Sequence, residues 1–309
     1  MSGHDHSNGG HAGHAHSVSP DADRGKLTVA LALIVGFMLV EVVIGVLVHS
    51  LALLSDAAHM LTDAGALGLS LVAIKLAKRP AKGAMTFGFK RVEILSAQFN
   101  GATLLVLALL IVYEGSSRLI TPPPVEGSAV LVVAIVGILV NLLATHTLSK
   151  ANRQSMNIEG SFQHLLTDLA AFIFTAIAGV VILTTGFGRA DGIASLIIAA
   201  IMLRAAYGLL RDTGRVFLEA APTGLDPDTI GRALLKQTGV VEIHDLHVWE
   251  ITSGFPALSA HVLVDATADC HAARRELEHE LHEHFKIDHT TLQVDHQGDQ
   301  LLTIKSLKQ

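Results

Sequence analysis

Long apolar runs fill the first two thirds of the chain. Six of them are separated by breaks that carry glycine, proline or charged residues, such as "TPPPVEGS" and "TGFGRAD". Each run is near or above the length of about 20 residues that a helix needs to span a hydrocarbon layer of about 30 Å. The pattern therefore predicts six membrane-spanning helices. They cover residues 27–48, 51–77, 91–119, 127–149, 159–185 and 191–210.

The pattern changes after the sixth run. "LDPDTIGRALLKQT" predicts a short helix with Asp226 as its N-cap. "VVEIHDLHVWEIT" and "PALSAHVLVDA" are strand-like runs joined by "SGFP", a hairpin signal. "ADCHAARRELEHELHEHF" predicts an amphipathic helix, apolar at Leu277, Leu281 and Phe285, and "TTLQVDH" predicts a last strand. The order αββαβ indicates a small α+β domain, an open sheet with helices on one face.

The chain thus divides into three predicted parts. Residues 1–24 include "HDHSNGGHAGHAH" and form a disordered, histidine-rich tail, because so polar a segment cannot bury a core. Residues 25–212 form the six-helix membrane domain, and residues 213–309 form the α+β domain. The first residues lack the basic start and apolar centre of a cleaved signal peptide.

Lysine and arginine predict the orientation. They gather in the breaks after the second and fourth runs and beyond the sixth, whereas the opposite breaks are poorer in them. Cytoplasmic loops of membrane proteins carry the excess of Lys and Arg. Both termini and the α+β domain are therefore expected in the cytoplasm.

Composition narrows the possible classes. Hydrophobic residues make up 50% of the chain and its mean hydropathy is +0.48, too apolar for an ordinary soluble domain. The single cysteine excludes a disulfide framework. The net charge of −6 gives no signal for nucleic-acid binding. The 18 histidines are a high number, and five of them lie among the first sixteen residues.

Two of the apolar runs contain the same polar motif, H-x-L-T-D. His59 and Asp63 lie in the second run, and His164 and Asp168 lie in the fifth. Positions i and i+4 share one helix face, so each pair can hold one ion between its side chains. Ionisable side chains within membrane spans are costly and usually functional, which favours a site over idle buried groups.

By the predicted topology the second and fifth helices run antiparallel, and if they touch, the four side chains converge at mid-depth. Two imidazoles and two carboxylates suit the tetrahedral coordination of Zn²⁺. These ligands bind metal only when they are deprotonated, and an imidazole ordinarily titrates at a pH of about 6.5. Protons and Zn²⁺ therefore compete, and a site that opens alternately to each side of the membrane would exchange them.

These motifs belong to a wider resemblance. "SLALLSDAAHMLTD", "TFGFKRVEILSA" with Asn100 following, "HLLTD" and "VVEIHDLHVWEITSGFPALSAHVLVD" together resemble the bacterial cation diffusion facilitators of the CzcD/ZitB zinc-transporter type, over nearly the whole chain after residue 24. The resemblance implies a homodimer in the inner membrane whose protomers have six helices and a ferredoxin-like, copper-chaperone-like cytoplasmic domain. It also implies that His59, Asp63, His164 and Asp168 form the transport site. A histidine in both first positions resembles the zinc-preferring members.

The expected function is export of cytosolic Zn²⁺ in exchange for H⁺, with no enzymatic activity and no nucleic-acid partner. A broader efflux antiporter for Cd²⁺, Co²⁺ or Ni²⁺ stays open, because ligand type separates these ions poorly. A membrane metal sensor is a further alternative. An intramembrane metalloprotease is disfavoured, because the chain has no HExxH and no glutamate beside either membrane histidine as a general base.

Three more polar residues lie in the apolar runs. Asp56 shares a helix face with His59. It either supports the metal ligands without binding the metal itself or is simply a polar residue near the outer helix end. Glu41 and Asn100 either line the ion path or make hydrogen bonds between helices, and the second role is preferred.

The α+β domain offers its own ligands. His244 and His261 lie in the two strand-like runs of the hairpin and can meet side by side, and Asp295 on the last strand could join them. The resemblance supports these three as a regulatory zinc site, because many members bind zinc at such positions. His247 is expected on the opposite face of the strand from His244 by the period-two rule.

Overall fold

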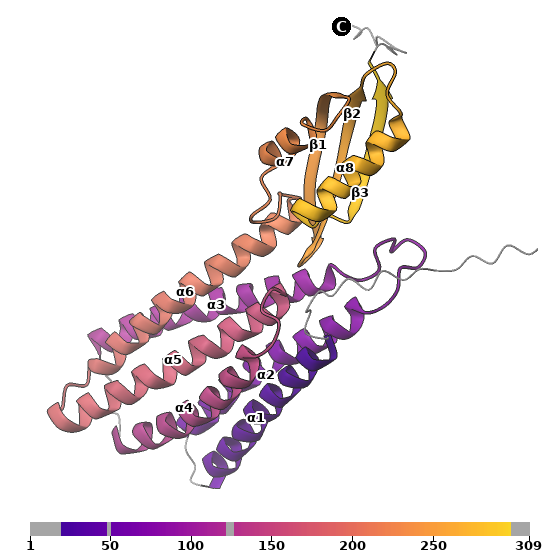
Figure 1. Cartoon of the computed structure of the whole chain (residues 1–309). Helices are drawn as coiled ribbons and strands as arrows, with labels where there is room; N and C mark the ends of the chain where they lie inside the picture. Colours follow the sequence, from indigo (N-terminus) through magenta and orange to yellow (C-terminus); the bar gives the residue numbers. More distant parts are fainter. Residues whose placement is uncertain (1–19, 48–50, 122–126, 298–309) are drawn as a thin grey trace, which may run out of the picture.

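The computed structural model describes residues 20–47, 51–121 and 127–297. Within this part, six helices are long and apolar enough to cross a membrane, which confirms the six predicted spans. They pack into one bundle, in which α2 lies against α1, α3 and α5 (Figure 1). The helices are α1 (Pro20–Leu47), α2 (Leu51–Ala77), α3 (Val92–Ile120), α4 (Gly127–Ser149), α5 (Met156–Thr185) and α6 (Ala190–Phe217).

The ends of α5 follow from local sequence. Ser155 is its N-cap, and the Ser155 side chain accepts a hydrogen bond from the Ile158 backbone N–H at 3.4 Å. Gly186 ends the helix in the left-handed conformation, with φ of +70°, which glycine adopts without steric cost. α6 instead continues past the predicted boundary at residue 212.

The bundle core is built from large aliphatic side chains on α1, α2, α4 and α5. Leu27, Leu67, Leu148 and Leu165 are each fully buried. Lipid tails are as apolar as these side chains, so close packing rather than the hydrophobic effect holds such helices together. The bundle therefore depends on the fit between neighbouring helices.

The second unit confirms the predicted αββαβ order. Its sheet has the order β1-β2-β3, in which β2 pairs antiparallel with β1 and parallel with β3. Leu277 and Leu281, two of the three predicted apolar positions of the amphipathic helix, are fully buried, and Phe285 packs against the same core. The elements are α7 (Pro227–Leu234), β1 (Val240–Thr252), β2 (Phe255–Val264), α8 (Cys270–Phe285) and β3 (His289–His296).

The tip of the β1–β2 hairpin contacts the helix bundle. The sheet lies beyond the end of α6, and the hairpin points back towards the helices (Figure 1). The Thr252 hydroxyl donates to the Lys90 carbonyl at 3.2 Å, and the Met156 backbone N–H donates to the Ser253 hydroxyl at 3.0 Å. The Lys90 ammonium lies 3.9 Å from the centre of the Phe255 ring. The hairpin thus contacts the residues that precede α3 and begin α5.

Candidate metal site

Three ionisable side chains meet between α2 and α5. Asp63 Oδ1 lies 2.8 Å from His164 Nε2, and Asp168 Oδ2 lies 4.0 Å from the same nitrogen. One ligand atom from each residue lies within 4.8 Å of the other two. The three residues are buried, with exposed fractions of 4%, 1% and 8%. The predicted contact between the second and fifth spans is therefore present, at the predicted residues.

The chemistry of this triad suits a divalent cation. Two carboxylates and one imidazole offer oxygen and nitrogen ligands, the set that Zn²⁺ takes in proteins. Buried carboxylates are costly unless a positive charge lies beside them. In the described part of the chain, this is the one group of three or more such ligand atoms that lies so close together.

The fourth predicted ligand cannot be placed. His59 belongs to α2, one turn before Asp63, but its side chain lies outside the part that the structure describes, as does that of Asp56. The assignment of His59 as a ligand, and of Asp56 as a residue behind it, stays a prediction.

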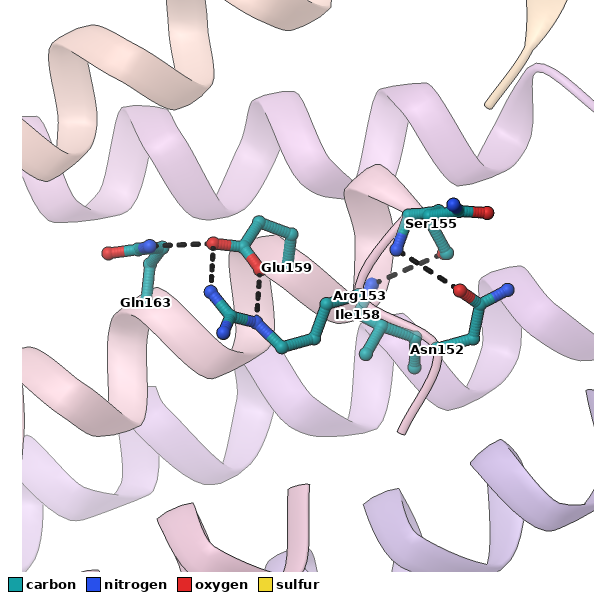
Figure 2. A network of polar contacts seen from close by, with 7 residues as sticks. Asn152, Arg153, Ser155, Ile158, Glu159 and Gln163 are labelled. Atoms are coloured by element: carbon teal, nitrogen blue, oxygen red, sulfur yellow. Dashed lines mark hydrogen bonds and ion pairs between the residues drawn. The ribbon is translucent and has the colours of Figure 1, made fainter. Parts of the chain in front are cut away.

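A polar network holds the start of α5, which leads to His164 (Figure 2). Arg153 donates from Nε and Nη2 to the two Glu159 carboxylate oxygens, at 2.7 and 3.0 Å. The Gln163 amide donates to Glu159 Oε1 at 2.6 Å. The hydrogen bond to Glu159 raises the pKa of Arg153 above its usual value, so this guanidinium stays charged. The network ties the first turns of α5 to the loop that precedes the helix, and Gln163 directly precedes His164.

Glu41 and Asn100 are both buried, on α1 and α3. The Asn100 amide donates to the Ser70 hydroxyl of α2 at 3.3 Å, which is the predicted kind of interhelical hydrogen bond. A part in the ion path stays a prediction for both residues. Sequence reasoning missed Ser70 and Ser161, whose hydroxyl oxygens lie 2.8 Å apart. The signal that could have found them is the presence of small polar residues within apolar runs.

In the α+β domain, His244 and His261 are direct partners in the β1–β2 register, and their ring centres lie 5.3 Å apart. This confirms that the hairpin brings them side by side. The Asp245 carboxylate lies 3.8 Å from His261 Nε2 and 3.0 Å from His247 Nε2. All four side chains are well exposed to solvent.

The expected orientation of His247 is wrong, and a β-bulge explains why. The register shifts between His244 and His247, so His247 lies opposite Ser259, two residues from His261 along β2. Asp245 adopts a φ of +53° at the bulge. The extra residue resets the alternation of faces, and His247 returns to the side of the other two histidines.

Asp295 lies opposite Leu263 in the β2–β3 register, whereas Gln293 lies opposite His261. The Asp295 carboxylate accepts a hydrogen bond from the Gln293 amide at 2.8 Å. Its participation in a site with the two histidines stays a prediction. The histidines of the N-terminal tail lie outside the described residues.

Comparisons with known proteins cover both units. A model of the cation efflux transmembrane domain matches residues 27–218, and a model of the cation efflux protein cytoplasmic domain matches residues 222–297. A cadmium, cobalt and zinc/H(+)-K(+) antiporter of Bacillus subtilis is 38% identical over 285 residues, covering 91% of each chain. The zinc transporter ZitB of Escherichia coli is 37% identical over 289 residues, covering 92% of each chain.

Among solved structures, the metal-bound C-terminal domain of the CzcD transporter from Cupriavidus metallidurans is 33% identical to the aligned part of this chain. That alignment covers 23% of this chain and 99% of the solved domain, with a TM-score of 0.22.

Proposed function

This chain belongs to the cation efflux family of membrane transporters, and from that premise we propose that it exports Zn²⁺ across the bacterial inner membrane in exchange for H⁺. The single observation that carries the proposal is the buried triad of Asp63, His164 and Asp168 between two membrane-spanning helices. The names of the relatives, which include zinc transporters and a proton antiporter, support both transported ions.

Proton exchange follows from the contact between Asp63 and His164. Their facing atoms lie 2.8 Å apart, and a carboxylate can only accept, so one proton must lie between Nε2 and Oδ1. Zn²⁺ needs the lone pairs of these same two atoms. A doubly protonated imidazole must give up one proton before Nε2 can bind the metal, so metal binding to that form of His164 releases one proton, and a proton that returns from the other side of the membrane displaces the metal.

His59 is the proposed fourth ligand. It precedes Asp63 by one turn of α2, so its helix position allows it to complete a tetrahedral set with the triad. When the site opens alternately to each side, the four ligands would load Zn²⁺ from the cytoplasm and release it outside.

The α+β domain is proposed to be cytoplasmic, to dimerise and to bind regulatory zinc. The matching cytoplasmic-domain model and the excess of Lys and Arg on the connected loops support this orientation. His244 and His261 are its central ligands. Asp245 and His247 join them more readily than Asp295 does, because the Asp245 carboxylate lies near both His261 and His247.

Asp63→Ala tests the function directly. In proteoliposomes with an imposed pH gradient, wild type should take up Zn²⁺, measured with a luminal zinc dye, and Asp63→Ala should not. Loss of a direct ligand should exceed the roughly 10–100-fold cost of losing an outer-shell partner.

The matched control is Asp212→Ala, which removes a half-exposed aspartate of α6 that pairs with neighbouring Arg211; it should transport like wild type. A panel of Cd²⁺, Co²⁺ and Ni²⁺ establishes the range of metals. Uptake by Asp63→Ala at the wild-type rate would refute the assignment.

A further inference from the structure

A second polar cluster lies within the bundle, between about one and two helical turns, or roughly 5–10 Å, from the triad along α2 and α5. It consists of Ser70 on α2, Asn100 on α3, and Asn157 and Ser161 on α5. Each of these residues is at most 1% exposed. The cluster lies on the side of the triad that faces the α+β domain, because α2 ends and α5 begins at that end of the bundle.

Counting protons fixes the direction of every hydrogen bond in the cluster. Ser161 donates its only hydroxyl proton to the Asn157 backbone carbonyl at 3.0 Å, so it must accept from Ser70 at 2.8 Å. Ser70 has then used its proton, and its oxygen must accept from the Asn100 amide at 3.3 Å. The Asn157 amide donates to the Ser70 backbone carbonyl at 3.0 Å. A backbone carbonyl can only accept, so the orientation of this amide is fixed as well.

The hydroxyl protons of Ser70 and Ser161 are thus both used within the network and each amide donates one N–H to it, while oxygen acceptors are left over. Asn100 Oδ1 and Asn157 Oδ1 are buried and have no hydrogen-bond partner among the described residues. The same holds for Ser96 Oγ, which lies one turn before Asn100 on the same face of α3. Buried acceptors without partners are costly, and the unpartnered carbonyl oxygens of neutral amides can bind a divalent cation through their lone pairs.

The cluster lies between the triad and a cavity of about 700 Å³ at the domain-facing end of the bundle. Ile74 of α2 and Ser155, the N-cap of α5, line this cavity, and they lie one turn after Ser70 and two residues before Asn157, on the side away from the triad. Its lining also includes the carboxylates of Asp23 and Glu93. An ion that moves from this cavity to the triad along α2 and α5 passes the level of the cluster.

We propose that the oxygens of Asn100, Asn157 and Ser96 form a transit site for a partly hydrated divalent cation on its way to the triad. The inference rests on the proposed function. Neutral oxygens hold a divalent cation more weakly than the carboxylates and imidazole of the triad do. A permeation path needs such a site, which binds well enough for the ion to enter and weakly enough for it to leave.

Two other roles of the cluster are compatible with the same hydrogen bonds and unpartnered oxygens. The cluster could serve only to hold α2, α3 and α5 together, or its acceptors could bind nothing but a buried water. Neither role involves metal, so the deciding experiment strengthens the site and looks for zinc there.

Asn100→Asp is the central variant, with Asn157→Asp as a second in case the first does not fold. A carboxylate here should convert the transit site into a tight one. Equilibrium binding to the purified, full-length protein should show one additional Zn²⁺ per protomer, and uptake in proteoliposomes should slow by at least about tenfold, because a tightly bound ion leaves slowly. The additional Zn²⁺ should persist when Asp63→Ala is combined with Asn100→Asp.

The matched control is Asn141→Asp. Asn141 is equally buried, but it donates to the Gly137 carbonyl of its own helix α4 and takes no part in the cluster; this variant should bind no additional Zn²⁺. If wild type transports zinc but both aspartate variants bind no additional metal, the transit site is refuted. The cluster then only holds the helices together or binds a buried water. If wild type transports no divalent metal, the proposed function itself fails.

Discussion

At the scale of residues, one nitrogen decides the chemistry. His164 Nε2 lies between two carboxylates from two helices, and the proton on its hydrogen bond to Asp63 occupies the place that a metal needs. Under the proposed function, the same three residues bind zinc and carry the proton in opposite directions.

Glu250 makes a pH-dependent contribution to stability. Burial raises the pKa of its carboxyl, although the Gly254 backbone N–H donates to it. The neutral form is favoured in the folded state, so this stability is present below the unfolded pKa of about 4.3 and is lost as the pH rises through the folded pKa. Glu250→Gln keeps an acceptor without the charge. It should raise the unfolding midpoint at pH 7–8 and leave it unchanged near pH 4.

The gain from Glu250→Gln should stay below about 1 kcal/mol, because the carboxyl is half-exposed and screened by solvent. The neighbouring Trp249 is the single tryptophan of the chain, so its fluorescence reports unfolding at this strand. A constant difference between the two proteins across the pH range would contradict the assigned cause.

Individual residues differ in how far the sequence predicts them. Asp63, His164 and Asp168 were predictable because ionisable groups in apolar helices stand out, and their i,i+4 spacing gives one face. Asp245 was not predictable, because no local sequence signal predicts the β-bulge that turns its side chain towards His247 and His261. The acceptors of Asn100 and Asn157 emerge only from hydrogen bonds between distant segments.

At the scale of elements, α4 positions the ligand helix. The Phe172 ring occupies the space that a side chain at position 137 would need, and residue 137 is a glycine. The same ring packs edge-on against Phe37 of α1, with 6.5 Å between the ring centres. Phe172 lies one turn beyond Asp168 on α5. The absence of a side chain at Gly137 therefore allows the close approach that sets this part of α5.

Gly137→Ala should disturb both stability and the site. Its methyl group would overlap the Phe172 ring, and overpacking of this kind typically costs about 1–3 kcal/mol. A lower melting temperature and weaker Zn²⁺ binding by calorimetry are expected. Gly36→Ala on α1, where a methyl group meets nothing within 4 Å, should change neither. Equal behaviour of the two variants would show that the α4–α5 contact does not position the ligands.

Element types and order followed from period and length, because apolar runs of membrane length and alternating strands are strong signals. Their exact pairing did not. The α2–α5 contact was predicted only on condition that the helices touch. The pairing of His244 with His261 was predicted, but the register beyond the bulge, where His247 lies opposite Ser259, was not.

At the scale of the whole molecule, the hairpin tip joins the two units. Thr252 and Ser253 contact the starts of α3 and α5. The Thr252 hydroxyl oxygen also lies 3.3 Å from the Glu93 carboxylate, and its single proton is shared between this carboxylate and the Lys90 carbonyl. Movement of the α+β domain is thus connected to the two helices that carry Asn100 and His164. The sequence did not predict this docking, because hairpin and helix ends are far apart along the chain.

The single cysteine tests the proposed orientation. Cys270 is half-buried at the start of α8, with its sulfur 3.4 Å from His296 Nε2. A membrane-impermeant maleimide should label it in inside-out vesicles and not in intact spheroplasts. Cys270→Ser should abolish the signal in both. Labelling of intact spheroplasts would place the α+β domain outside the cell.

The central claim is that Zn²⁺ and protons compete for one buried site. The most direct measurement records both ions together, in proteoliposomes with a luminal pH dye and a luminal zinc dye and no imposed pH gradient. Addition of external Zn²⁺ should drive zinc in and make the lumen more alkaline in a fixed ratio, and Asp63→Ala should abolish both signals. Rapid zinc uptake by wild type without any change in luminal pH would contradict the claim.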